Sequence, residues 1–153
     1  ITEQNIRDGL ATAHWPGRLE LLRREPVVIV DGAHNPQGAE ALLESLNALF
    51  PGRKINFVIG VLADKDYSTT LGMTVPHAKC FYTVTPPNKR ALSSDKLAEE
   101  IKKHGDVPVY SYDSIPEAID AVLASVAPDE VVCIFGSLYQ VGDVRSYFGR
   151  DTF

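Results

Sequence analysis

Short apolar runs alternate with amphipathic stretches along most of this chain. Four consecutive β-branched residues, Val27 to Val30, are typical of a strand that is buried on both faces in the middle of a parallel sheet. Similar runs predict strands over 55–61, 79–85, 108–112 and 131–135. A loosely alternating segment over 19–24 predicts a short, half-exposed strand that is added antiparallel or at the edge.

Apolar residues at helical spacing separate these strands. They predict helices over 37–50, 67–75, 94–104 and 115–126, and a last helix that follows Gly136 and ends near Phe148. Thr2 caps a first helix that reaches about Ala13. Because parallel strands joined in this way need right-handed crossovers, we expect a Rossmann-like α/β domain over 1–153, with a mostly parallel sheet and helices on both faces.

Composition and charge indicate which partners and which cellular compartment are expected. The chain has 153 residues, of which 44% are hydrophobic and 23% charged, enough for one domain with its own core. A net charge of −5 without any Lys/Arg run argues against nucleic acid, and no apolar stretch approaches the roughly 18 residues of a membrane span. Cys80 and Cys133 fall within predicted strands, so we expect reduced core thiols in a cytoplasmic protein. We also expect a monomer.

The segment after the first buried strand is a candidate ligand site. Asp31 stands where that strand should end, and Asn35 and Pro36 are suited to cap and begin the next helix. Ligands of open parallel sheets bind at the carboxyl ends of the strands. Asp31 can therefore accept hydrogen bonds from ribose hydroxyls, or it can simply cap the following turn. His34 lies just before a helix N-terminus, where it can contact a phosphate or a carboxylate or serve as a structural loop residue.

Two further residues have a similar dual interpretation. Arg18 follows a Pro-Gly turn and is suited to bidentate contact with phosphate, although a lone arginine is usually a surface charge. Ser137 follows Gly136 at the end of the last strand, where its hydroxyl can bind a carboxylate, cap the helix, or do both. Asp64, Lys65 and Asp66 form either a functional loop or a solvated turn.

Several common sites are missing from the sequence. The chain has neither the Gly-rich turn of a dinucleotide site nor a Gly-Lys-Ser/Thr phosphate loop, and no Gly-x-Ser-x-Gly elbow. His14, His77 and His104 have no metal-ligand spacing with His34 or the cysteines. We therefore expect no metal site and no catalytic residue in these 153 residues.

Four segments together resemble the folylpolyglutamate synthase/dihydrofolate synthase family, a branch of the Mur ligase superfamily. They are Trp15-Pro16-Gly17-Arg18, Asp31-Gly32-Ala33-His34-Asn35-Pro36, Gly60-Val61-Leu62-Ala63-Asp64-Lys65-Asp66 and Gly136-Ser137-Leu138-Tyr139. The resemblance covers essentially the whole chain and matches only the C-terminal, glutamate-ligase domain of those enzymes. It implies an amide-forming ligase that uses ATP and Mg²⁺ to activate a folate or dihydropteroate carboxylate as an acyl phosphate, which L-glutamate then attacks.

The resemblance also implies how the site is divided. Arg18, Asp31 and His34 would bind ATP, with Arg18 on its phosphates and Asp31 on its ribose. His34 and Ser137 would lie on the glutamate side. The N-terminal domain of the family carries the P-loop and the magnesium ligands and is absent from this chain, which begins at Ile1, so we expect a fragment or processed product that is inactive alone. The alternatives are another Mur-type ligase, or a stand-alone Rossmann-like module that binds a small nucleotide or an acidic metabolite.

Overall fold

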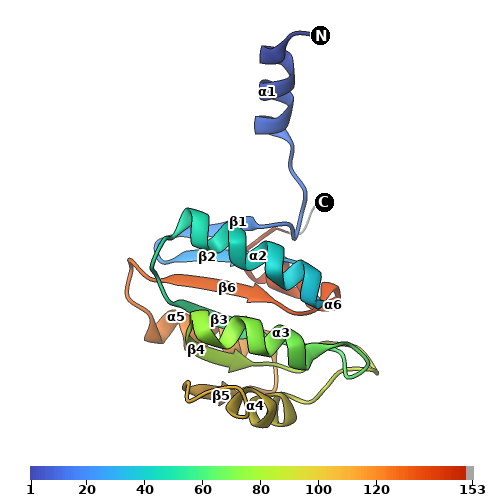
Figure 1. Cartoon of the computed structure of the whole chain (residues 1–153), viewed down its shortest axis with the longest axis vertical. Helices are drawn as coiled ribbons and strands as arrows, with labels where there is room; N and C mark the ends of the chain where they lie inside the picture. Colours follow the sequence, from blue (N-terminus) through green and yellow to red (C-terminus); the bar gives the residue numbers. More distant parts are fainter. Residues whose placement is uncertain (151–153) are drawn as a thin grey trace.

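A six-stranded sheet forms the centre of the fold (Figure 1). The computed structural model describes residues 1–150. The strands lie in the order β1-β2-β6-β3-β4-β5, and only β1 runs antiparallel to its neighbour. Their bounds are Glu20–Arg24 (β1), Val27–Val30 (β2), Ile55–Ile59 (β3), Ala78–Thr83 (β4), Val109–Ser111 (β5) and Val131–Phe135 (β6). The predicted mostly parallel sheet with an antiparallel edge strand is confirmed.

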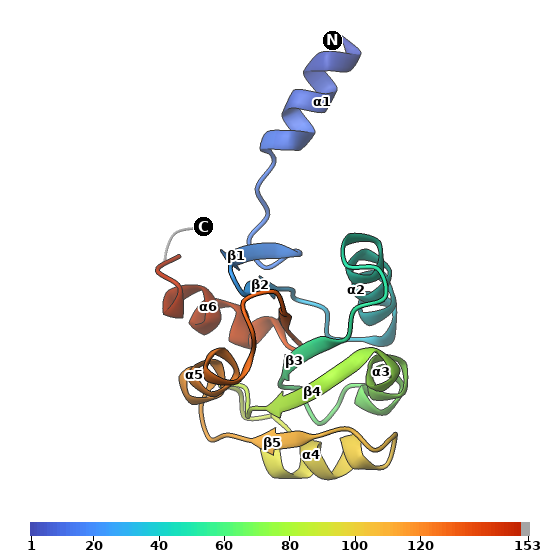
Figure 2. The same cartoon turned by 90° about the vertical axis from the view of Figure 1, so that its left-hand side faces the viewer.

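Helices cover both faces of this sheet, as expected (Figure 2). On one face lie α2 (Pro36–Leu49), α3 (Tyr67–Thr74) and α4 (Ser94–Lys102), with a short 3₁₀ turn η1 (Val75–His77) after α3. On the other face lie α5 (Ile115–Ser125) and α6 (Leu138–Tyr147). The first helix, α1 (Glu3–Thr12), extends away from the sheet, and none of its residues is buried.

The central strands carry two cores, one on each face. Every residue of β3 and β6 is buried, which explains why all of them except Asn56 are apolar. On the α2–α4 side, Phe57 packs against Phe81 and Phe135 with ring centroids 5.5 and 5.4 Å apart. The thiols of Cys80 and Cys133 are free and buried, as predicted.

Two strands end earlier than the apolar pattern predicts. The runs over 55–61 and 79–85 leave the sheet at Ile59 and Thr83. Val61 and Val84 remain buried after the strands have ended. The prediction was too long because loop residues that pack into the core are as apolar as strand residues.

The order of the strands creates a point at which neighbouring loops diverge. The helices that follow β2 and β3 lie on one face, whereas α6, which follows the intervening β6, lies on the other. A crevice at the carboxyl ends of the strands results, and ligands of open α/β sheets bind in such crevices. The loops after β2, β3 and β6 border it.

Candidate functional site

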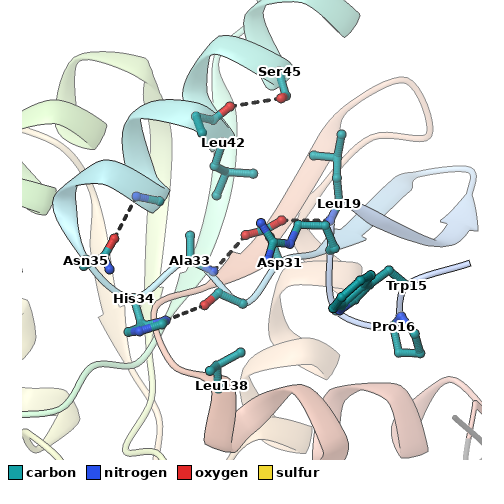
Figure 3. Close-up of a pocket in the computed structure, with 15 residues that line it drawn as sticks. Trp15, Pro16, Leu19, Asp31, Ala33, His34, Asn35, Leu42, Ser45 and Leu138 are labelled. Atoms are coloured by element: carbon teal, nitrogen blue, oxygen red, sulfur yellow. Dashed lines mark hydrogen bonds between the residues drawn. The ribbon is translucent and has the colours of Figure 1, made fainter.

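A cavity of about 540 Å³ opens at this crevice (Figure 3). The turn before β1 and the loop after β2 form most of its wall, and α2 and α6 contribute the rest. Its lining residues are Trp15, Pro16, Gly17, Arg18, Leu19, Asp31, Gly32, Ala33, His34, Asn35, Gly38, Ala41, Leu42, Ser45 and Leu138. The structure thus brings together Arg18, Asp31 and His34, the three residues that the sequence assigns to nucleotide binding.

Asp31 is nearly buried, with 7% of its surface exposed, and its carboxylate joins two backbone segments. Oδ2 accepts a hydrogen bond from the N–H of Leu19 at 2.7 Å, and Oδ1 accepts one from the N–H of Ala33 at 2.8 Å. The second contact is the turn cap that the sequence allowed. Each carboxylate oxygen can accept a further hydrogen bond, so capping the turn and binding a ligand are compatible roles.

His34 is half-buried, and one of its ring nitrogens is already engaged. Nδ1 lies 2.8 Å from the carbonyl oxygen of Gly32. Because a carbonyl only accepts, this contact requires a proton on Nδ1, which leaves Nε2 for a ligand. The next residue, Asn35, caps α2 by accepting from the N–H of Gly38 at 2.8 Å, and Pro36 begins the helix, as predicted.

Arg18 projects from a tight turn at the mouth of the cavity. The N–H of Arg18 donates to the carbonyl of Trp15 at 3.1 Å, and Gly17 has a φ of +69°, a conformation that favours glycine. The Arg18 side chain is exposed, whereas Gly17 is buried. The turn is therefore anchored in the body of the protein while its arginine remains available to a ligand.

A second cavity, about 170 Å³, adjoins the first. It is lined by His34, Leu62, Lys65, Arg90, Ser137, Leu138 and Tyr139. His34 and Leu138 line both cavities, so the two spaces meet at these side chains. Ser137 is 1% exposed, and its Oγ accepts from the N–H of Tyr139 at 3.2 Å, which makes it the N-cap of α6.

The loop over 64–66 divides into three roles. Asp64 pairs with Arg90 at 2.8 Å, and Asp66 caps α3 by accepting from the N–H of Thr69 at 3.1 Å. Only Lys65 lines the smaller cavity. The loop is therefore part structural turn and part cavity wall, and a functional role for Lys65 stays a prediction.

Sequence reasoning missed Arg90, which comes from the loop after β4. The signal was present, because the polar run Asn88-Lys89-Arg90 follows a buried strand whose carboxyl end meets the same sheet edge. The charge of Asp64 raises the pKa of Arg90 further above its ordinary value, so the guanidinium is positively charged throughout the physiological range. The smaller cavity thus has two cationic side chains, Lys65 and Arg90, beside His34.

Among residues 1–150, no group of three or more His, Cys, Asp or Glu side chains is placed to hold a metal ion. None of the helices in this part of the chain is long and apolar enough to cross a membrane.

The sequence of this chain is similar to that of known ligases. Residues 17–138 match the family model described as the glutamate ligase domain of Mur ligases. The folylpolyglutamate synthase of Lacticaseibacillus casei is 39% identical over 146 residues, which cover 95% of this chain and 32% of that protein.

Solved structures have the same fold. Mycobacterium tuberculosis folylpolyglutamate synthase complexed with ADP matches with a TM-score of 0.89 and 32% identity, over 100% of this chain and 36% of that one. A bifunctional folylpolyglutamate synthase/dihydrofolate synthase with Mn, AMPPNP and L-glutamate bound matches with a TM-score of 0.84 and 28% identity, over 97% of this chain and 35% of that one. The chain thus spans about a third of the length of these relatives.

Proposed function

Because the chain belongs to the glutamate ligase domain family of the Mur ligases, we propose that it is the C-terminal domain of an ATP-dependent ligase that adds L-glutamate to a folate or dihydropteroate carboxylate. The observation that carries this proposal is the pair of adjoining cavities that share His34. Such a ligase must hold a nucleotide and an amino acid side by side, so that the amine can attack the acyl phosphate.

In this proposal the larger cavity takes the nucleotide. Its volume of about 540 Å³ lies within the range of small-ligand sites, roughly 300–1,000 Å³. Arg18 would contact the phosphates because a guanidinium forms bidentate hydrogen bonds with phosphate oxygens. Asp31 would use its remaining lone pairs on the ribose hydroxyls. The solved relative that contains ADP supports a nucleotide as the ligand.

The smaller cavity would take glutamate. Its cationic residues, Lys65 and Arg90, complement the two carboxylates of that amino acid, and Ser137 supplies a hydroxyl at the start of α6. His34 stands between the two ligands, with Nε2 as its unengaged ring nitrogen. The relative with L-glutamate bound supports this substrate class.

The remaining parts of the reaction are assigned to other residues of a longer protein. We propose an N-terminal P-loop domain that cradles the phosphates, holds Mg²⁺ and binds most of the folate. Mg²⁺ supplies neutralisation of the phosphate charge, in line with the Mn that accompanies AMPPNP in one relative. The 153-residue chain is then inactive alone. We further propose that the longer protein is a monomer and that it is cytoplasmic, the second in keeping with two free buried thiols.

The test compares this chain with the longer polypeptide that contains it. The longer protein should release ADP only when ATP, L-glutamate and a folate or dihydropteroate acceptor are all present, and the 153-residue chain should release none. Equal turnover without the acceptor would contradict the proposal. Calorimetric titration of the chain with ADP and with glutamate tests the stand-alone module, because that alternative requires micromolar binding by the chain itself.

A further inference from the structure

A buried ion pair lies directly behind the turn that carries Arg18. Nε of Arg145, in the last turn of α6, lies 3.0 and 3.2 Å from the two carboxylate oxygens of Glu20 on β1. The side chains are 3% and 5% exposed, and the two residues are 125 positions apart in the chain. Glu20 also accepts a hydrogen bond from the N–H of Gly17 at 2.7 Å.

Gly17 is held on three sides. Its N–H donates to Glu20, and its carbonyl accepts from the N–H of Gly32 at 2.6 Å. A Cβ atom at Gly17 would lie 2.6 Å from Cγ1 of Val141 on α6, so the backbone is in direct contact with that helix. These contacts determine the direction in which the chain leaves the turn, and therefore the placement of Arg18 and Trp15 on the wall of the larger cavity.

Stability alone gives little reason to bury this ion pair. Removing two charges from water costs several kcal/mol per ion, and replacing a buried pair by well-packed apolar residues is often neutral or stabilising. An apolar side chain at position 20, however, cannot accept the hydrogen bond from Gly17. The Arg145 guanidinium offsets the negative charge of Glu20, so the pair keeps a hydrogen-bond acceptor buried beside Gly17, and Nε2 of His14 lies 3.7 Å from the same carboxylate.

We infer that Glu20 is a positioning residue for nucleotide binding: anchored by Arg145, it holds the turn at Gly17 so that Arg18 and Trp15 face the larger cavity. That Glu20 holds the turn follows from the contacts around Gly17. That this affects nucleotide binding rests on the proposed function, because it requires the larger cavity to take the nucleotide.

The chain contains a matched control at the other end of the sheet. Glu130 accepts from the N–H of Ala127, three residues earlier, at 2.7 Å, and it pairs with Lys79. The hydrogen-bond pattern is that of Glu20, Gly17 and Arg145, but this pair is more exposed, and it precedes β6 instead of bordering the crevice. Removing it should leave the turn at Gly17 unaffected.

The first test is amide hydrogen exchange, followed by NMR, on this chain. In the double variant Glu20→Met/Arg145→Met the amide of Gly17 should exchange at least about tenfold faster, because its buried acceptor is gone. The melting temperature should stay within about 3 °C, because the two opposite charges of the buried pair are removed together. Glu20→Gln/Arg145→Met retains an acceptor oxygen at position 20 and removes the buried cation together with the carboxylate, so it should keep the Gly17 amide within about threefold of the wild-type rate. Glu130→Met/Lys79→Met should leave Gly17 unchanged.

Unchanged protection of Gly17 in the Glu20→Met/Arg145→Met variant would overturn the inference. So would an equal loss of protection at Gly17 and at Phe57 on β3, because that pattern indicates general destabilisation. If the variant does not fold, hydrogen exchange in the wild-type chain still tests the inference. The amides of Gly17 and Gly32 should both be protected from exchange. Rapid exchange at Gly17 would contradict the hydrogen bond from Gly17 to Glu20.

The second test measures kcat/KM for ATP in the longer polypeptide. We expect about a tenfold decrease in Glu20→Met/Arg145→Met and no change in Glu130→Met/Lys79→Met. A Gly17 amide that loses protection without any effect on ATP would overturn the positioning role. Absence of ATP turnover in the wild-type protein would contradict the proposed function instead. The hydrogen-exchange experiment would then still test whether Glu20 holds the turn at Gly17.

Discussion

The Asp31 carboxylate accepts a hydrogen bond from the backbone N–H of Leu19, 2.7 Å away, and so joins the end of β2 to the turn before β1. Leu19 has a φ of +44°, in the left-handed region that residues other than glycine rarely adopt. The hydrogen bond helps to hold it there. The residue assigned to the nucleotide therefore also shapes the cavity wall.

This double role predicts the effect of Asp31→Asn. An amide has only one acceptor oxygen, so either Leu19 or Ala33 loses its hydrogen-bond partner and faces an NH₂ group. We expect the free energy of unfolding of this chain in urea to fall by about 1–3 kcal/mol. Asp106→Asn, at an exposed position, should change it by less than about 0.5 kcal/mol. Equal stability of the two variants would show that the contacts of Asp31 are dispensable.

The local sequence was sufficient to predict most of the fold. β-branched runs located the strands, with β6 correct to the residue, and the Asn35-Pro36 pair located the start of α2. These features depend on neighbours within one turn or one strand. The edge of the sheet that carries the site could also be predicted, because the carboxyl ends of parallel strands lie at one edge whatever their order.

Contacts between distant segments could not be predicted in this way. The pairing of Glu20 with Arg145 depends on the strand order, which brings α6 behind β1. Arg90 is another example, because only the folded loops show that it shares a cavity with Lys65. The sequence marks both arginines simply as charged residues, and burial or cavity lining becomes visible only in three dimensions.

Tyr82 should make stability depend on alkaline pH. It is 4% exposed, and burial raises the pKa of its phenol to about 12. The unfolded chain releases this proton near pH 10, so between pH 10 and 12 the native state binds more protons than the unfolded state. The contribution to stability is therefore complete below about pH 10 and is lost as the pH rises through 12.

The measurement is urea unfolding between pH 9 and 12, with Tyr82→Phe as the comparison. Phe cannot ionise, so the variant should lose less stability than the wild type across this interval. Tyr110→Phe, at a position that is 54% exposed, serves as the control and should follow the wild type. If the free energy of unfolding falls equally with pH in Tyr82→Phe and in the wild type, the raised pKa of Tyr82 is contradicted.

Two glycines should respond in opposite directions to replacement by alanine. Gly136 has a φ of +113°, and a Cβ there would lie 2.3 Å from the carbonyl oxygen of Gly60. Because neither backbone can yield, we expect Gly136→Ala to destabilise the chain by about 3 kcal/mol or more. Gly142 lies exposed inside α6 with nothing near its Cβ position, so Gly142→Ala should stabilise by about 0.5–1 kcal/mol. The denaturant midpoints of the two variants measure both changes in stability. If Gly136→Ala is as stable as the wild type, the loops that follow β3 and β6 can move apart.

Arg90 should distinguish the two substrates of the proposed ligase. It lines only the smaller cavity, where a charge-assisted hydrogen bond to a carboxylate of glutamate is worth about 1.5–3 kcal/mol. In the longer polypeptide, Arg90→Ala should therefore raise the KM for glutamate by about tenfold or more and leave the KM for ATP within about twofold. Lys89→Ala, an exposed neighbour outside both cavities, controls for a general loss of positive charge in this loop. Equal increases in both KM values would mean that the two cavities do not divide the substrates, because a residue that lines only one of them would then affect both.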